Sequence, residues 1–437
     1  MFMNIHRLKQ ILCICGLTIV SGFLHAAVVD VVLSNTNQII RLGGNDIAFL
    51  KSATMISPHD SFWTQLQYQS GLNVPATITE PMAGELDVPL PLVGPGEIKF
   101  APDLASQGYS PGIIDFQIKR GNSGSAQNRT GRYVTFAHPD DRLFLSKGET
   151  AFVQATALIS FDLPSWTMLA YQTGASDPVS VTLPLWGDPN EAVPLVGPAV
   201  ISFSPNLDGA ANGFGIVGFE ITKENARPGL NGGADHYVTF AHPDDRIRLS
   251  KDQVAFVVST AVISLASPSW TMIQYQSGPR NPVTVTLPLQ DAINGELPIV
   301  GPAEIQVSTN MDGAATGPGI VAFKIVSRQQ ANSEADDVKG FSTQGFVTLA
   351  QTGDSVRLAA NEMAVVVSAY SGPWGFAWQS VDFQAASGST VSTEVGLFPG
   401  SLSPDSPIIF SGPGNIVLND PSPSGAIGLQ ILKRISF

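Results

Sequence analysis

Short segments in which apolar and polar residues alternate make up most of this 437-residue chain. Typical examples are "RLFLS", "WTMLAYQ", "VSVTLPL" and "IVGFEITK", which are rich in Val, Ile, Thr and aromatic residues and are separated by Gly, Pro, Asp and Asn. A period of two is the spacing of a strand with one buried face, and no segment sustains the 3.6-residue period of a capped helix. The pattern therefore predicts an all-β protein with few helices.

The alternating pattern occurs in four copies. Residues 133–221 align without a gap to 237–325, and 54 of the 89 positions are identical. One strand is recognisable in every copy, as "SFWTQLQYQSG", "PSWTMLAYQTG", "PSWTMIQYQSG" and, more weakly, "GPWGFAWQS". Its tryptophans are 103, 104 and 104 residues apart, at Trp63, Trp166, Trp270 and Trp374. Such spacing predicts four copies of one folding unit.

Polar stretches rich in Gly, Ser and Asn separate the copies and have the composition of linkers. They cover 121–131, 224–236 and 328–344. We therefore expect four domains of roughly 90–100 residues, each long enough for its own core. The predicted domains are residues 27–120, 133–223, 237–327 and a divergent fourth copy at 345–437.

Each copy contains seven recognisable short strands, which is the count of an immunoglobulin-like β-sandwich. In architecture the chain resembles the tandem immunoglobulin-like repeats of exported bacterial proteins, without pointing to one family. A Greek-key barrel is the alternative. Pro184 and Pro288 lack an amide donor, so their strand is expected to lie at a sheet edge or to end there. Because only 14% of residues are charged, we also expect apolar surface between domains or against a partner.

The amino-terminal residues have the order of a secretory signal peptide. Arg7 and Lys9 precede an apolar run over 11–24, and small residues follow at 26 and 27. Cleavage near Ala26 would make 1–26 the signal peptide and leave an exported chain. The two cysteines, at positions 13 and 15, would leave with it, so the mature protein is predicted to contain no disulfide.

The charge of the mature chain argues against nucleic acid as a partner. Without Arg7 and Lys9 it has 21 basic and 36 acidic residues, a net charge near −15, and no cluster of Lys or Arg. A nucleic-acid-binding protein needs a basic surface. The expected partner is a protein or a glycan at a cell surface, with possible self-association through the fourth copy.

The string "YVTFAHPDDR" occurs at 133–142 and again at 237–246. Its core, Ala-His-Pro-Asp-Asp, resembles the zinc-binding motif of the N-acetylglucosaminyl de-N-acetylase family, which would imply a zinc hydrolase. That motif belongs to an α/β domain and works with a further histidine, whereas here the surroundings are all-β. The other two copies replace it with "LSNTNQ" and "LAQTGD", which share turn-forming residues but no metal ligands. We therefore predict a hairpin turn, with the aspartates bonded to nearby amides, and no metal.

Two further motifs favour turns or strands over chemistry. "NLDGAANG" (206–213) and "NMDGAATG" (310–317) begin like a calcium loop but lack its distal glutamate, so an Asp-Gly turn is preferred. The alternation before Phe437 is like the last strand of an outer-membrane barrel, but the earlier copies have it too. No nucleophile, carboxylate pair or phosphate loop recurs, so neither an enzyme nor a cofactor is expected.

The tryptophans are the candidate binding residues. Alternation along "WTMLAYQ" places Thr167, Leu169 and Tyr171 on one face and Trp166, Met168 and Ala170 on the other. Each tryptophan either closes a sandwich core or forms an exposed platform for a sugar ring or a partner. The candidates are Trp63, Trp166, Trp270, Trp374 and Trp378, and nearby Asp177 and Arg280 could add polar contacts.

The sequence thus favours an exported, non-enzymatic protein of four β-repeats that acts as a surface spacer, adhesin or assembly component. The alternative is a soluble glycan-binding protein in which repeated weak aromatic sites gain avidity. Loss of glycan binding on Trp166→Ala would favour the second, and surface fractionation without sugar binding would favour the first.

Overall fold

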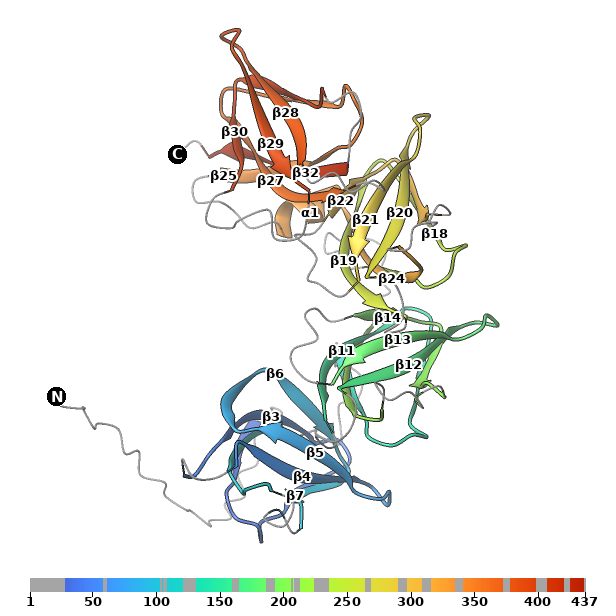
Figure 1. Cartoon of the computed structure of the whole chain (residues 1–437), viewed down its shortest axis with the longest axis vertical. Helices are drawn as coiled ribbons and strands as arrows, with labels where there is room; N and C mark the ends of the chain where they lie inside the picture. The colour runs from blue at the N-terminus through green and yellow to red at the C-terminus, as the bar shows by residue number, and fades with distance from the viewer. Residues whose placement is uncertain are drawn as a thin grey trace, which may run out of the picture.

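The structure is a computed structural model of the chain, and it forms four β-sandwiches that follow one another along a curve (Figure 1). It describes residues 28–57, 61–102, 104, 108–120, 131–158, 165–185, 193–205, 207, 213–223, 236–263, 269–289, 297–308, 316–334, 341–371, 378–397, 407–419 and 425–435. The predicted signal peptide lies outside these residues.

Each sandwich, called here repeat 1 to repeat 4, contains eight strands. Repeat 1 has β1 (Val28–Leu33), β2 (Ile40–Leu42), β3 (Ile47–Thr54), β4 (Trp63–Ser70), β5 (Ala76–Pro81), β6 (Ala83–Val93), β7 (Gly96–Phe100) and β8 (Ile113–Lys119). Repeat 2 has β9 (Gly131–Phe136), β10 (Arg142–Leu145), β11 (Glu149–Ala157), β12 (Trp166–Thr173), β13 (Val179–Pro184), β14 (Pro194–Val196), β15 (Ala199–Phe203) and β16 (Ile216–Lys223).

Repeats 3 and 4 follow the same plan. Repeat 3 has β17 (His236–Phe240), β18 (Arg246–Leu249), β19 (Gln253–Val262), β20 (Trp270–Ser277), β21 (Val283–Pro288), β22 (Leu297–Val300), β23 (Ala303–Val307) and β24 (Gly319–Ser327). Repeat 4 has β25 (Phe341–Leu349), β26 (Ser355–Leu358), β27 (Glu362–Ser371), β28 (Trp378–Ala385), β29 (Thr390–Gly396), β30 (Ile409–Ser411), β31 (Gly414–Val417) and β32 (Gly425–Arg434). Among the described residues, the single helix is α1 (Arg328–Glu334), between repeats 3 and 4.

The strand order is the same in all four repeats. One antiparallel sheet joins the first, eighth, third and sixth strands, and the other joins the second, seventh, fourth and fifth, as in β1-β8-β3-β6 and β2-β7-β4-β5. Two four-stranded sheets with this order form a jelly roll, a double Greek key. The prediction of four tandem β-sandwiches is confirmed, with eight strands per repeat where the sequence predicted seven.

The additional strand is the sixth, and the sequence pattern indicated a turn at its residues. In repeat 2 it is only three residues long and begins at Pro194. It lies at the edge of its sheet, where a residue without an amide donor is tolerated. Pro184 behaves as predicted for the same reason, because β13 is an edge strand and ends there. The Gly-Pro bond that follows the sixth strand is cis in every repeat.

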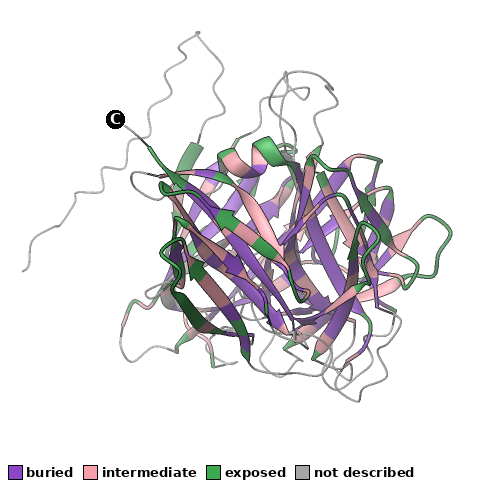
Figure 2. Ribbon diagram, turned by 90° about the horizontal axis from the view of Figure 1, so that it is seen from above, coloured by how far each residue is buried: buried purple, intermediate pink, exposed green. Residues whose placement is uncertain are grey.

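The core of each repeat lies between its two sheets, where the purple, buried strands face each other in Figure 2. In repeat 2 its largest fully buried residues are Phe136, Tyr171 and Phe219. Each core also extends into the next repeat: the cluster of repeat 1 includes Ala137 and Ile216 of repeat 2. The predicted apolar surface between domains is therefore present, and neighbouring repeats pack directly on one another.

The stretch 328–344, read from its composition as a linker, is partly regular structure. It contains α1 and the first residues of β25. Ala331 of α1 is buried against Val254, Phe256 and Val326 of repeat 3. The short helix therefore rests on the third sandwich, and its polar residues face outward. No helix among the described residues is long and apolar enough to cross a membrane.

Candidate functional site

The strands that begin with the repeated tryptophan are β4, β12, β20 and, in repeat 4, β28. Register identifies Trp378 as the counterpart of Trp270: Tyr275 pairs with Ile305 as Phe383 pairs with Ile416, five residues further along each strand. The spacing argument that aligned Trp374 with Trp270 was therefore wrong by four residues. Equal spacing fails because the segment between repeats 3 and 4 is longer: Thr135 and Thr239 are 104 residues apart, whereas Thr239 and Thr348 are 109 apart. Trp374 lies outside the described residues.

The tryptophans of the first three repeats are partly buried. Trp63, Trp166 and Trp270 have intermediate exposure, whereas Trp378 is 54% exposed. The carbonyl of Trp166 accepts a hydrogen bond from the Gly213 amide (2.9 Å), and Trp270 and Gly317 are joined in the same way (2.9 Å). The backbone at each tryptophan is thus tied to the segment that leads into the eighth strand.

The face of β12 that carries Trp166 is not an open platform. Leu169 and Tyr171 point into the core, as the alternation predicted. Met168 on the opposite face is also buried, because the segment after β15 covers it: the Ser204 amide donates to the Met168 carbonyl (2.8 Å), and Leu207 packs there.

The Ala-His-Pro-Asp-Asp strings form turns, as predicted, but not hairpins, because the flanking strands, such as β9 and β10, belong to different sheets. Asp141 Oδ2 accepts the amides of Ala137 (2.7 Å) and His138 (2.8 Å), and Asp245 holds the second copy identically. The described residues contain no group of three His, Cys, Asp or Glu side chains placed to bind a metal. The calcium-like strings fall largely outside the described residues.

The same turn is built in the two copies that lack the motif. Gln38 Oε1 accepts the amides of Ser34 (2.8 Å) and Asn35 (2.9 Å), and Asp354 accepts those of Ala350 and Gln351 (both 2.9 Å). One side-chain oxygen at a fixed position therefore organises the turn between the first and second strands throughout the chain.

The most regular feature of the molecule is the contact between successive repeats. At each of these three junctions, a threonine in the first strand of one repeat donates a hydrogen bond to the carbonyl of a proline in the sixth strand of the preceding repeat. The pairs are Thr135 with Pro91 (2.7 Å), Thr239 with Pro194 (2.6 Å) and Thr348 with Pro298. A proline in the edge strand of one repeat thus contacts the first strand of the next repeat.

An aromatic pair accompanies each of these hydrogen bonds. A phenylalanine of the third strand meets, edge to face, an aromatic residue of the next repeat's first strand. The ring centroids are 5.2 Å apart for Phe49 and Tyr133, 5.1 Å for Phe152 and Tyr237, and 5.2 Å for Phe256 and Phe346. Edge-to-face geometry is favourable for aromatic rings, so each junction is held by packing as well as by a hydrogen bond.

The sequence analysis missed these residues, although a signal was present. "YVTF" recurs at 133–136 and 237–240, and "PLVGP" at 91–95 and 194–198 returns as "PIVGP" at 298–302, but neither string by itself indicates that the two meet. Tyr133 has a pKa raised to about 12, first because it is buried and second because Glu220 is close to it. Its hydroxyl therefore remains protonated at physiological pH.

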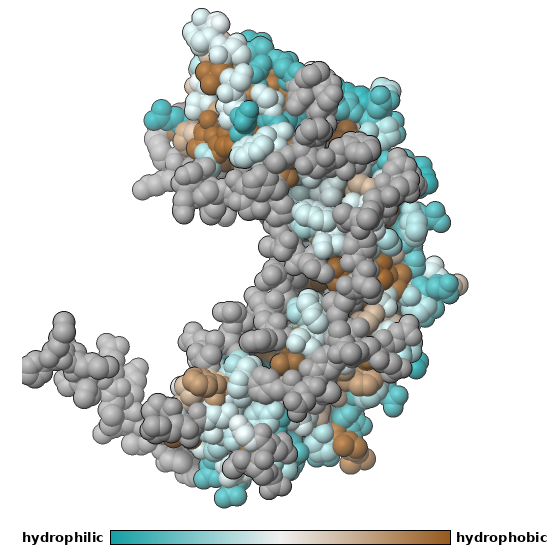
Figure 3. Space-filling view, viewed as in Figure 1, coloured by the Kyte–Doolittle hydropathy of each residue, from teal (hydrophilic) through white to brown (hydrophobic). Residues whose placement is uncertain are grey.

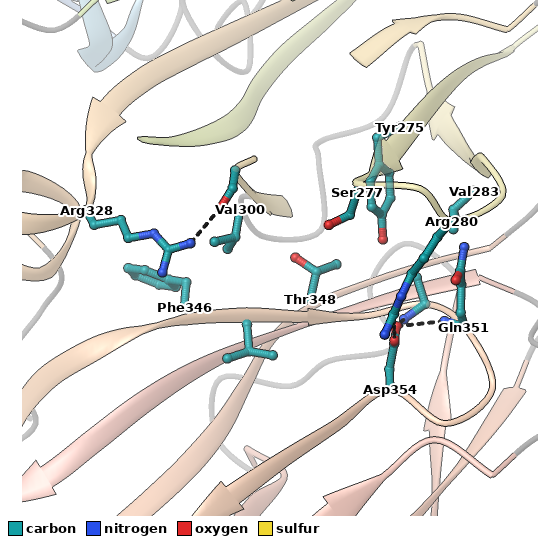
Figure 4. A pocket seen from close by; sticks show the side chains of 13 residues that line it. Tyr275, Ser277, Arg280, Val283, Val300, Arg328, Phe346, Thr348, Gln351 and Asp354 are labelled. Atoms are coloured by element: carbon teal, nitrogen blue, oxygen red, sulfur yellow. Dashed lines mark hydrogen bonds and ion pairs between the residues drawn. The ribbon is translucent and has the colours of Figure 1, made fainter. Parts of the chain in front are cut away.

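A cavity of about 290 Å³ lies at the third junction, between repeats 3 and 4 (Figure 4). Its wall includes Tyr275, Arg280, Arg328, Phe346 and Asp354. Arg280 forms an ion pair with Asp354 across the junction, and Arg328 Nη2 donates to the Gly301 carbonyl (2.6 Å). The polar contacts that the sequence analysis ascribed to Arg280 are thus made, toward the next repeat and not toward a tryptophan.

One titratable residue is buried inside repeat 1. Glu80 of β5 is 7% exposed, and desolvation raises its pKa to about 8. The corresponding residue in β13 is Leu183, since Thr64 pairs with Glu80 as Thr167 pairs with Leu183. The sequence signal was the string "TITEP", where the middle copies have "VTLP".

Comparison with known proteins identifies no family. No protein-family model matches the chain, and no curated protein matches it. A solved structure described as "Crystal Structure of the STIV MCP" is similar over 47% of this chain and 89% of that chain, with 9% sequence identity and a TM-score of 0.12. At that TM-score the similarity carries no argument about this protein.

Proposed function

We propose that this chain is an exported, non-enzymatic protein in which four jelly-roll repeats serve as a spacer, adhesin or assembly component at a cell surface. The observation that carries the proposal is the junction of threonine, proline and two aromatic rings, built three times to one plan. Repeats joined in this way keep a fixed orientation, which suits a part that must span a distance.

The surface supports the same reading. The described residues follow a curved array whose hydrophobic patches are separated by hydrophilic residues (Figure 3). Side-chain hydrogen bonds and continuous apolar clusters join the repeats, so bending at a junction would expose buried apolar area. The signal-like sequence over 1–26 supplies the route to the surface.

The test is deletion of one whole repeat, made between equivalent positions of repeats 2 and 3. Removing 133–236 joins residue 132 to Tyr237, so that Tyr237 and Thr239 take the positions of Tyr133 and Thr135 beneath Phe49 and Pro91. The first junction is thereby rebuilt with the same tyrosine and threonine, and Ala322 takes the position of Gly218 beside Pro91. The shortened chain should stay surface-attached, and small-angle scattering should show a maximum dimension smaller by about one repeat.

Deletion of 345–437 is the matched comparison, because it removes the divergent repeat and keeps the near-identical pair. Loss of surface attachment in this variant alone would support the proposal and assign attachment to repeat 4. If the intact protein is found only as a free, diffusible species in cell fractionation, the spacer or adhesin role is wrong.

A second candidate function, glycan binding, is favoured by one observation. Trp378 exposes 54% of its surface, while its three counterparts are partly buried. A stacking site would then be confined to repeat 4 rather than repeated. Glycan-array binding that is lost in Trp378→Ala and kept in Trp166→Ala would support this candidate, and equal binding by both variants would contradict it.

A further inference from the structure

At the third junction, one tyrosine hydroxyl lacks the hydrogen bond that its counterparts make at the first two junctions. Tyr68 donates to the Val93 carbonyl (2.5 Å), and Tyr171 donates to the Val196 carbonyl (2.7 Å). Tyr275 is the third member of this series, but its hydroxyl makes no hydrogen bond to any described residue, although Tyr275 is only 6% exposed. Because this hydroxyl borders the open cavity, it is accessible to a ligand as a donor and acceptor.

Figure 4 shows where the free hydroxyl lies: Tyr275 hangs into the cavity beside Ser277, with Arg280 on one side. In the other two repeats the tyrosine bonds the last residue of the sixth strand, which here is Val300 of β22, and this end of β22 makes a different contact. Arg328 donates to the carbonyl of Gly301, the residue after Val300, from the opposite wall (2.6 Å). The tyrosine donor and the guanidinium group therefore both border an open volume.

The charge of the cavity favours an anion. Two arginines and one aspartate line it, and Arg280 is already paired with Asp354. Arg328 has one donor committed to Gly301, so the rest of its five N–H donors remain for a ligand. The site thus has an excess of one positive charge in a chain whose formal net charge is −13. That excess suits a monoanion.

The first two junctions lack this arrangement. The position of Arg280 is occupied by Ser176 in repeat 2 and by Asn73 in repeat 1, and the backbone carbonyl of each residue in this series accepts the same glutamine side chain. Phe346 replaces Tyr133 and Tyr237 on the facing strand. The third junction thus combines an added cation, an unused donor and an apolar wall.

We propose that this cavity binds a compact monoanion that carries a carboxylate together with hydroxyl groups, of the kind found in sugar acids. A guanidinium group matches a carboxylate in shape and charge. Tyr275 and Ser277 would bond the hydroxyls, and Val300 and Phe346 would cover the apolar side of the ring. A volume of about 290 Å³ lies at the small end of ligand sites and fits a single ring. The inference rests on the cavity and does not depend on the proposed surface role.

The experiment is calorimetric titration of the full mature chain with D-glucuronate, D-glucose and acetate, which separate the carboxylate from the hydroxyls. Glucuronate should bind, and glucose and acetate should each bind about tenfold more weakly or not at all. Arg328→Gln should weaken glucuronate binding by about tenfold, and Tyr275→Phe by about three- to tenfold.

Tyr171→Phe is the matched control, because it removes the same atom from a hydroxyl already bonded to Val196. It should leave the glucuronate affinity unchanged, and a thermal melt of each variant establishes that it folds. Absence of glucuronate binding by the unmodified chain would overturn the proposal. Equal affinity for glucose and glucuronate, tighter binding of inorganic sulfate, or equal losses in Tyr275→Phe and Tyr171→Phe would also overturn it.

Discussion

Repeats 1 and 2 have the same strand order, but they differ at one position of the core and on the outer face of one sheet. Inside, Glu80 stands where repeat 2 has Leu183, each opposite a buried threonine. Both side chains are almost fully buried, at 7% and 2% exposure. The comparison shows that register decides which positions are interior, and that the fold accepts an acid there when the acid is neutral. The raised pKa of Glu80, about 8, is the consequence of that burial.

Outside, the difference lies on the sheet formed by the first, eighth and third strands. In repeat 2 this sheet receives repeat 1, and Gly218 lies so close to Pro91 that a Cβ there would be 2.6 Å from its ring, whereas repeat 3 accommodates Ala322 at the same position. In repeat 1 the same position is Asp115, which accepts a hydrogen bond from Ser52 Oγ (2.7 Å), and Thr135 is replaced by the 47%-exposed Val32. Repeat 2 packs on the same face of repeat 1 through Phe49 and Pro91, but Val32 stays exposed. Equivalent positions of this sheet are thus covered by a neighbour in repeat 2 and left exposed in repeat 1.

The largest effect expected from this comparison is that of Glu80→Leu. A folded-state pKa above the unfolded one means that the native state binds the extra proton, so wild-type stability is highest below pH 4.5 and falls as pH rises toward 8. The slope is about 1.4 kcal/mol per pH unit, which amounts to on the order of 5 kcal/mol across the window. Glu80→Leu should abolish this slope and stabilise repeat 1 at pH 8.

Hydrogen exchange of β4 and β5 at pH 5 and pH 8 measures the effect within repeat 1 alone. Leu183→Glu in repeat 2 is the reciprocal variant, and it should create the same pH dependence there. An unchanged slope in Glu80→Leu would mean that another group titrates in this window.

The next effect concerns covered and exposed positions on this face. Phe49 is 9% exposed and meets Tyr133 edge to face. Truncating such a buried ring costs about 3 kcal/mol or more, so Phe49→Ala should uncouple repeat 1 from repeat 2. Val32→Ala, at an exposed position of the same face, should cost less than about 0.5 kcal/mol. Urea unfolding of the two variants tests this, and similar losses would show that contact with repeat 2 does not set the importance of a position.

These contrasts also show how far the sequence could lead. Alternating patterns and internal repeats were sufficient for four tandem sandwiches and for Pro184 and Pro288 as edge residues, because strand periodicity and missing amide donors are local properties. The sixth strand was missed because three residues beginning with Pro194 form a strand only when a partner strand is beside them.

The candidate site was less accessible to the sequence. Pairs such as Thr135 and Pro91 are distant in the chain, and neither residue type suggests the other. The cavity depends on the direction of the Tyr275 hydroxyl, although the tyrosine is common to three repeats. What distinguishes the third junction is Arg280 and Arg328, which act on backbone and side chains of different elements. Contacts of this kind follow from the fold and not from local pattern.

A smaller effect is expected at the turn after the first strand. Asp141 in repeat 2 accepts two amides with a charged oxygen, whereas Gln38 in repeat 1 uses a neutral one. Hydrogen bonds to a charged group are stronger, so Asp141→Ala should cost about 2 kcal/mol and Gln38→Ala about 1 kcal/mol. Thermal unfolding of both variants provides the measurement, and a larger loss for Gln38→Ala would contradict the role of charge.

The smallest effect lies at the next turn, where Glu149 of repeat 2 corresponds to Asp46 of repeat 1. Glu149 and Asp46 accept the amides of Ser146 (2.8 Å) and Gly43 (2.9 Å), respectively, and Glu149 also lies 3.7 Å from Arg132 and 3.5 Å from Lys223. Burial alone would raise the pKa of Glu149, but the Ser146 amide and the two cations outweigh it, and the net shift is downward.

A lowered pKa means that Glu149 stabilises the fold above the unfolded pKa, near 4.5, and that this contribution disappears as the pH falls through the folded value. Because both cations are largely exposed, the contribution should stay below about 1 kcal/mol. Glu149→Gln should therefore flatten the acid side of the stability profile of repeat 2, measured by urea unfolding between pH 3 and pH 6. Arg132→Gln should flatten it partly, since it removes one cation and keeps the Ser146 amide. A profile unchanged by either substitution would assign the acid sensitivity of repeat 2 to other carboxylates.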